Sequence, residues 1–192
     1  MRTLIVLALT ALAVAASAAP LQFALKGRVL GATELEACGQ AVVTEYQPLL
    51  DAAGSSDVLF PASSCDVEFG TVARVAVDGP ARLLFWRGRL IRVIVHFGRL
   101  DPQDVASLRG ALVGLYQSPS TKRQSPFITD VWRAGSRRLE LERTQSSPTN
   151  TDLFLTESTD WSEYDRASER ATAAMAAVDR RRRREDVSTS PR

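Results

Sequence analysis

The 192-residue chain is 45% hydrophobic and carries 24 Lys and Arg residues against 22 Asp and Glu residues. This composition is that of an ordinary globular protein of one domain, and it excludes a fibrous or wholly disordered chain. One His and two Cys are too few for a typical structural zinc site and leave little room for a His-dependent triad. Composition therefore argues against several enzyme classes before any motif is considered.

Residues 1–18 have the features of a secretory signal peptide. Arg2 supplies a positive n-region, Leu4 to Ala16 is an almost unbroken apolar run, and Ala16-Ser17-Ala18 offers the small residues that a signal peptidase recognises. The run is shorter than the roughly 20 residues of a transmembrane helix, and the nearest Cys lies too far away to carry a lipid anchor. Arg rather than Lys supplies nearly all the positive charge, which is typical of GC-rich bacterial genomes. We expect an exported periplasmic protein without a transmembrane segment.

Export changes the interpretation of Cys38 and Cys65. In an oxidising compartment two Cys in one domain usually form a disulfide. The bond would close a loop of about 28 residues, which the chain-entropy model values at roughly 3–4 kcal/mol. A reactive thiol is the alternative, but the sequence has no C-x-x-C spacing and the single His lies far along the chain.

The first half of the mature chain predicts one helix and three strands. Thr33 and Glu36 form a capping box, and helical spacing of apolar residues extends from Thr33 to Gln47. Alternation then predicts strands over 66–77, 82–86 and 89–97, joined by short turns into an antiparallel meander. In the third strand Ile91, Val93, Val95 and Phe97 are expected on one face, with Arg92, Ile94 and His96 on the other.

The second half repeats this order. Asp101 and Pro102 start a helix that ends near Tyr116, and 118–126 is expected to be a polar loop. Strands follow over 127–132, 137–143 and 152–158, with Leu139 and Leu141 facing inward.

The predicted fold is α+β: residues 19–158 form an antiparallel sheet of about five to six strands with two packing helices. The helix-plus-strands order of 33–97 and 101–158 suggests a duplication, as do the similar runs "FWRGRLIRV" and "VWRAGSRRLEL". A long C-terminal helix is expected over 159–184, with its apolar face packed in the first half, and residues 185–192 are expected to be a disordered tail.

Three ionisable residues are candidates for chemistry. His96, as a general base, would need a carboxylate or nucleophile beside it; the alternative is a solvent-facing His on the sheet. Glu140 and Glu142 share one strand face roughly 7 Å apart, a spacing that suits paired acid–base work on a glycosidic bond. The alternative is a charged outer sheet face that includes Arg138. No nucleophile elbow, phosphate loop, dinucleotide fingerprint or zinc-protease motif is present. We therefore expect no catalytic residue, cofactor or metal.

Two further features suggest contact with partners. Trp86 and Trp132 each adjoin an Arg and a Gly turn, so either would be a recognition anchor if exposed, whereas Trp at a strand end commonly buries its ring over the core. Arg180, Arg181, Arg182, Arg183 and Arg184 would contact anionic lipid or lipopolysaccharide by charge, or simply solvate a helix end. The rest of the mature chain is mildly acidic, which argues against specific nucleic-acid binding.

Gly31-Ala32-Thr33-Glu34 followed by "FWRGRLIRVIVHF" resembles small periplasmic α+β domains. The order is similar to the outer-membrane assembly lipoproteins of the BamE (SmpA/OmlA) type and to the duplicated beta-lactamase-inhibitor fold, over about residues 27–158. This chain departs from the BamE pattern because it lacks a lipidated Cys. The resemblance implies a protein-binding or assembly role, with an envelope protein as partner. We therefore expect an exported, non-catalytic binding or accessory protein. A small hydrolase using Glu140 or Glu142, and an envelope protein tethered by its Arg-rich tail, are the alternatives.

Overall fold

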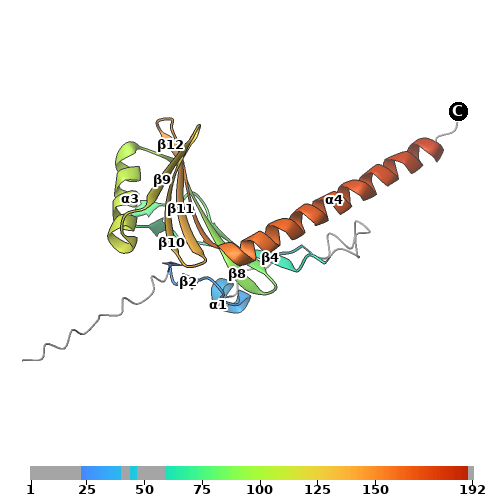
Figure 1. Cartoon of the computed structure of the whole chain (residues 1–192), viewed down its shortest axis with the longest axis horizontal. Coiled ribbons are helices and arrows are strands. Elements are labelled where there is room, and N and C mark those ends of the chain that lie inside the picture. The colour runs from blue at the N-terminus through green and yellow to red at the C-terminus, as the bar shows by residue number, and fades with distance from the viewer. Residues whose placement is uncertain (1–22, 40–43, 47–58, 190–192) are drawn as a thin grey trace, which may run out of the picture.

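The computed structural model of the chain describes residues 23–39, 44–46 and 59–189. The expected signal peptide lies outside these residues. The fold is α+β: one eight-stranded antiparallel sheet has short helices on one face, and a long helix leaves it at the C-terminus (Figure 1). Within the described ranges no helix is both long enough and apolar enough to cross a membrane.

The elements follow one another in a simple order. They are β1 (Ala24–Leu25), β2 (Arg28–Val29), α1 (Glu34–Cys38), β3 (Thr44–Glu45), β4 (Ala62–Val67), β5 (Thr71–Val72), β6 (Val75–Ala76), β7 (Ala81–Trp86), β8 (Arg89–Leu100), α3 (Pro102–Tyr116), β9 (Ser120–Gln124), β10 (Phe127–Ala134), β11 (Arg137–Thr144), β12 (Thr149–Glu157) and α4 (Ser158–Thr189).

The strand order of the sheet is symmetric about its centre. It reads β3-β4-β7-β8-β12-β11-β10-β9, so two consecutive four-stranded meanders meet through their last strands, β8 and β12. One helix precedes the four strands of each half, as the duplicated pattern predicts. The two Trp-Arg runs are not equivalent, however. Trp86 ends the third strand of its half, whereas Trp132 lies in the second strand of the other.

The first helix is much shorter than predicted. Its capping box is confirmed, with Thr33 and Glu36 bonded reciprocally. The helix nevertheless ends at Cys38, because Gly39 adopts a φ of 61° and donates its N–H to the carbonyl of Leu35. Residues 44–45, which the helical spacing included, instead form β3 against β4. Residues 40–43 and 47 of the predicted helix lie outside the described residues.

The sheet has more strands than the expected five to six, and its elements begin and end at different residues. The largest difference is β9, which occupies part of the predicted polar loop. All five of its side chains are polar and exposed, so the segment has no alternation of apolar and polar residues. Backbone pairing with β10 defines it as a strand. In the first half, β4 begins earlier than predicted, and the following residues fold into the small hairpin β5–β6.

The main core lies on the face of the sheet that α1 and α3 cover. Leu139 and Leu141 face inward as predicted, and both are fully buried. Their partners across the sheet and on α3 are also buried: Leu83, Phe85, Leu90, Val93, Val95, Leu108, Leu112, Leu153 and Leu155. Ile91 departs from the predicted pattern. A register shift between β7 and β8 leaves it unmatched, and it packs on the opposite face with Trp86 and Ala167.

A buried carboxylate joins α3 to the second half of the sheet. Asp130 is fully buried on the core face and accepts hydrogen bonds from Arg109 of α3 at 2.8 Å and from Arg143 of β11 at 2.7 Å. Thr121 of β9 donates to its other oxygen. Burial raises the pKa of Asp130, but the three donors outweigh it, and the pKa lies below its ordinary value.

The two cysteines are joined as predicted. The disulfide between Cys38 and Cys65 links the end of α1 to β4, with Cα atoms 6.3 Å apart. α1 has only five residues, so the bond holds an element too short to be stable by itself.

Replacing both cysteines with Ser is therefore expected to lower the free energy of unfolding by roughly 3 kcal/mol. Urea unfolding with and without dithiothreitol measures this change. The wild type should lose a similar amount on reduction, whereas the double variant should not respond to the reductant. Equal stability of the oxidised wild type and the double variant would contradict the expectation.

Candidate functional site

The side of the sheet opposite α1 and α3 is the candidate site, and we call it the open face. The pairing of β8, β12, β11, β10 and β9 places its side chains in three rows that run across the strands. The first row is Arg92, Thr156, Arg138 and Arg133; the second is Ile94, Phe154, Glu140, Val131 and Ser120; the third is His96, Asp152, Glu142, Thr129 and Lys122.

The rows separate charge. The first row is cationic, the middle row has an apolar centre, and the third combines His96 with two carboxylates before it ends at Lys122. The residues paired directly with Arg92 and with Glu142 in their rows do not carry the opposite charge. The open face therefore has a positive side and a negative side with apolar surface between them.

The cationic row is fixed at one end by aromatic rings. The guanidinium of Arg92 lies 4.6 Å from the ring centroid of Phe154 and 4.2 Å from that of Trp161, the first aromatic residue of α4. Burial between these rings lowers the pKa of Arg92, although Glu140 opposes this effect. A guanidinium remains charged under such a shift, so the two rings hold a cation in a fixed position beside α4.

The negative row contains a His–carboxylate pair. His96 Nδ1 lies 2.7 Å from Asp152 Oδ1, and the His side chain is 54% exposed. His96 thus has the carboxylate that a general base would need, but it reaches solvent as the alternative interpretation states. Asp152 is directly opposite Glu142 across the β11–β12 pair. The sequence did not indicate this grouping, because Asp152 lies more than fifty residues from His96.

The two predicted acids have different surroundings. Glu140 forms an ion pair with Arg138, whose Nε lies 3.0 Å from Glu140 Oε2. Among the described residues no ion pair of Glu142 is found; burial raises its pKa, and Asp152 and Glu140 raise it further, while Arg92 opposes them. The open face therefore holds one neutralised carboxylate and one carboxylate whose ionised form is disfavoured. Such perturbed groups concentrate at functional sites, although structural networks also contain them.

Both tryptophans proposed as contacts are buried. Trp86 is 5% exposed and Trp132 is 3% exposed, so neither ring is presented to a partner, and the alternative interpretation of a ring over the core describes them better. Trp86 packs with Phe60 and Tyr164 beneath α4. Trp132 lies on the core face and donates its indole N–H to the carbonyl of Gln117 at 2.8 Å. Strand alternation alone does not show that these two rings are buried near α4 and α3.

The five consecutive arginines lie in the C-terminal helix, as predicted. Arg180 to Arg184 are exposed on the far part of α4, which continues to Thr189. Residues 185–189, which were predicted to belong to the tail, are therefore helical, and residues 190–192 lie outside the described residues. Acidic residues four positions after Arg181 and Arg182 favour this continuation, because opposite charges at that spacing support a helix.

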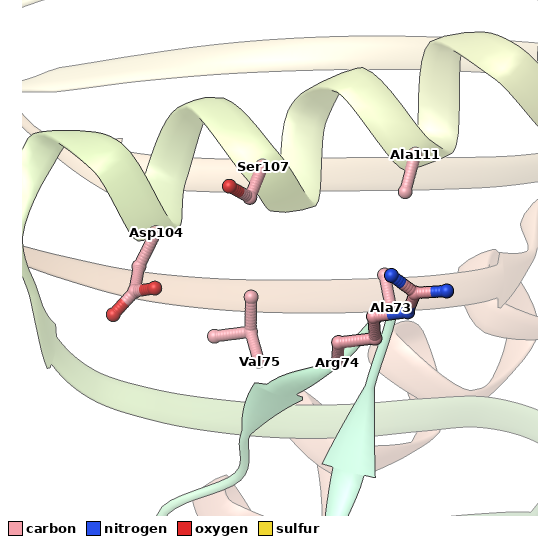
Figure 2. A pocket seen from close by; sticks show the side chains of 6 residues that line it. All are labelled: Ala73, Arg74, Val75, Asp104, Ser107 and Ala111. Atoms are coloured by element: carbon pink, nitrogen blue, oxygen red, sulfur yellow. The ribbon is translucent and has the colours of Figure 1, made fainter.

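A groove lies on the other side of the molecule from the open face, between α3 and the β5–β6 hairpin (Figure 2). It has a volume of about 510 Å³ and is lined by Arg74 and Val75 of the hairpin and by Asp104 and Ser107 of α3. Alanines at positions 73 and 111 complete its walls. The sequence did not predict this groove. Its lining is small and offers one charge of each sign, so it supports fewer specific contacts than the open face.

In comparisons with known proteins, no family model matches the chain, and no curated protein or solved structure matches it significantly. The resemblance to BamE-type domains and to the beta-lactamase-inhibitor fold therefore remains a prediction.

Glu142 should cost the protein stability at neutral pH. A carboxyl whose pKa is raised on folding is destabilising once the pH exceeds its unfolded value, and the cost disappears at low pH, where it is protonated in both states. Glu142→Gln is therefore expected to raise the free energy of unfolding at pH 7, and this gain should vanish near pH 3. Urea unfolding across this range measures it.

Glu140→Gln is the matched control, since the same change there removes the ion pair with Arg138 and should not stabilise the protein. A loss of stability in Glu142→Gln at pH 7 would show that the negative row is not under electrostatic strain.

Proposed function

We propose that this chain is an exported, non-catalytic binding or accessory protein of the bacterial periplasm, and that the open face contacts its partner. The observation that carries the proposal is the separation of charge on this face into a cationic row and an acidic row around Ile94 and Phe154. Complementary charge chiefly gives an interface its orientation and its association rate, and apolar surface in the centre contributes affinity.

The position of α4 supports this use of the face. The helix contacts the sheet near Ile94 and Trp86 and then leaves it, so its later part projects away from the strands (Figure 1). Beyond the helix, the face reaches solvent: Asp152 is 34% exposed and Lys122 is exposed. A partner that carries acidic groups opposite Arg133 and basic groups opposite Asp152 would fit this arrangement.

One observation and one expectation from the sequence support the proposed compartment. The disulfide between Cys38 and Cys65 is of the kind that persists in oxidising surroundings. The expected signal peptide would bring the chain there, with an envelope protein as the expected partner.

The proposal predicts contact on one face only. A photoreactive amino acid at Lys122 or Arg133, both exposed on the open face, should give a discrete crosslinked product in the native compartment. The same group at Gln103 or Ser107, exposed on α3, should not. Gel mobility and mass spectrometry identify the products.

Reversing the acidic row in the variant Glu142→Lys/Asp152→Lys should abolish that crosslink, because two repulsive contacts would replace two attractive ones. Crosslinks of equal yield from α3 and from the open face, or a crosslink that survives the reversal, would overturn the proposed contact surface.

One observation favours a second candidate, a small periplasmic hydrolase. Glu140 and Glu142 lie two residues apart on one strand face, roughly 7 Å by strand rise, and burial raises the pKa of Glu142. Carboxylates with different environments are the arrangement that glycoside hydrolysis uses, one as acid and one as base.

The hydrolase alternative predicts turnover by the purified chain. Reporter glycosides incubated with the wild type would release product, and Glu142→Gln would lower the rate by about 100-fold or more. Under the binding proposal neither protein turns over these substrates, while the crosslink from Lys122 remains. Turnover and crosslinking, measured on the same preparations of the wild type and the variant, therefore distinguish the two functions.

A further inference from the structure

The long C-terminal helix carries a cationic stripe that extends well beyond the run Arg180–Arg184. Arg166, Arg170, Arg181 and Arg184 are separated by four, eleven and three residues. All three intervals are close to whole turns of an α-helix, so these arginines fall within about 60° of one another around the axis. The stripe spans 19 residues, or about 27 Å along the helix.

The stripe faces away from the sheet. The residues through which α4 packs on the sheet are Trp161, Tyr164, Ala167, Ala171 and Met175. The centre of that packed face lies about 130° around the helix from the centre of the stripe, and all four stripe arginines are exposed. Packing therefore holds the helix in place and leaves the stripe available to solvent.

Two acidic residues lie close to the stripe: Glu163, three residues before Arg166, and Glu185, four residues after Arg181. Glu163 lies on the same side of the helix but is already paired with Arg87, at 3.2 Å. Arg87 in turn lies 5.3 Å from the ring centroid of Trp86, so the β7–β8 turn holds the cation that neutralises Glu163. Small side chains, Ala173 and Ala177, occupy the intervening positions on the helix.

We infer that this stripe binds the phosphate-bearing surface of an anionic lipid bilayer. The helix is straight and projects from the body (Figure 1), so a flat surface can meet the whole stripe at once. Arginine suits this role because its planar guanidinium forms paired hydrogen bonds to phosphate oxygens. Each cation close to an anionic membrane adds to the attraction, so several aligned arginines act together.

The shape of the molecule favours a membrane over a nucleic acid. The stripe occupies one side of a single projecting helix, and the rest of the mature chain is mildly acidic. A polyanion wrapping around the protein would meet this negative charge. A plane touching only the outer side of α4 would not. This inference does not depend on the role of the open face.

Sedimentation with vesicles tests the inference. The full mature chain should sediment with vesicles of phosphatidylcholine containing 30% phosphatidylglycerol, and it should stay in solution with pure phosphatidylcholine. Raising the salt from about 50 to 500 mM should release it, because screening shortens the range of the attraction. The quadruple variant Arg166→Gln/Arg170→Gln/Arg181→Gln/Arg184→Gln should bind the anionic vesicles at least tenfold more weakly.

A matched variant removes four cations elsewhere: Lys26→Asn, Arg74→Asn, Arg99→Gln and Arg123→Gln. It has the same net charge as the stripe variant and should keep wild-type binding. Gln is a good helix former, and circular dichroism checks that α4 persists in the stripe variant. Equal loss of binding in both variants, no binding by the wild type, or preference for single-stranded DNA over anionic vesicles at equal salt would each overturn the inference. None of these outcomes affects the crosslinking test of the open face.

Discussion

The antiparallel pairing of β8 with β12 determines both surfaces of this protein. It is the only strand pairing between the two meanders within the described sheet, and it aligns Val93 with Leu155 and Val95 with Leu153. These four residues are fully buried in the main core. Because side chains alternate along a strand, the same register places Arg92, His96 and Asp152 on the opposite side. A shift by one residue would expose the core and bury the charges, so the requirement for a dry core also sets the geometry of the open face.

The energetic roles of the two faces are therefore different. The core face satisfies its one deeply buried carboxylate, Asp130, with two arginines and a threonine. On the open face Glu142 lacks an equivalent partner, and its ionised form is disfavoured by burial and by neighbouring acids. Natural proteins commonly accept such local costs where a surface has a use. Three donors hold the carboxylate of Asp130, whereas burial and neighbouring acids disfavour the ionised form of Glu142.

Helix α4 closes one end of the open face and also carries a separate charged surface. Its first turns close one end of the open face, where Trp161 and Phe154 hold Arg92 between their rings. Its later turns carry arginines on the side away from the sheet. One helix thus anchors itself by aromatic packing and presents charge by periodicity, so the lipid-facing and partner-facing surfaces would lie on different sides of the molecule and could be occupied together.

Local sequence patterns were sufficient for much of this fold. Alternation located β7, β8, β10, β11 and β12, Asp101 marked the start of α3, and the pair of cysteines predicted the disulfide. These features depend on neighbours in the chain or on chemistry that one residue type carries by itself. Three features could not be obtained in this way. β9 has no apolar alternation, α1 ends early at a glycine inside a helical pattern, and Ile91 changes face at a bulge. The first depends on backbone pairing with β10, the second on the conformation of Gly39, and the third on packing against Ala167 of the distant helix α4. The same reason explains why Trp86 and Trp132 are buried under helices, and why the charges of the open face form rows: their neighbours lie on other strands, and only the tertiary structure brings them together.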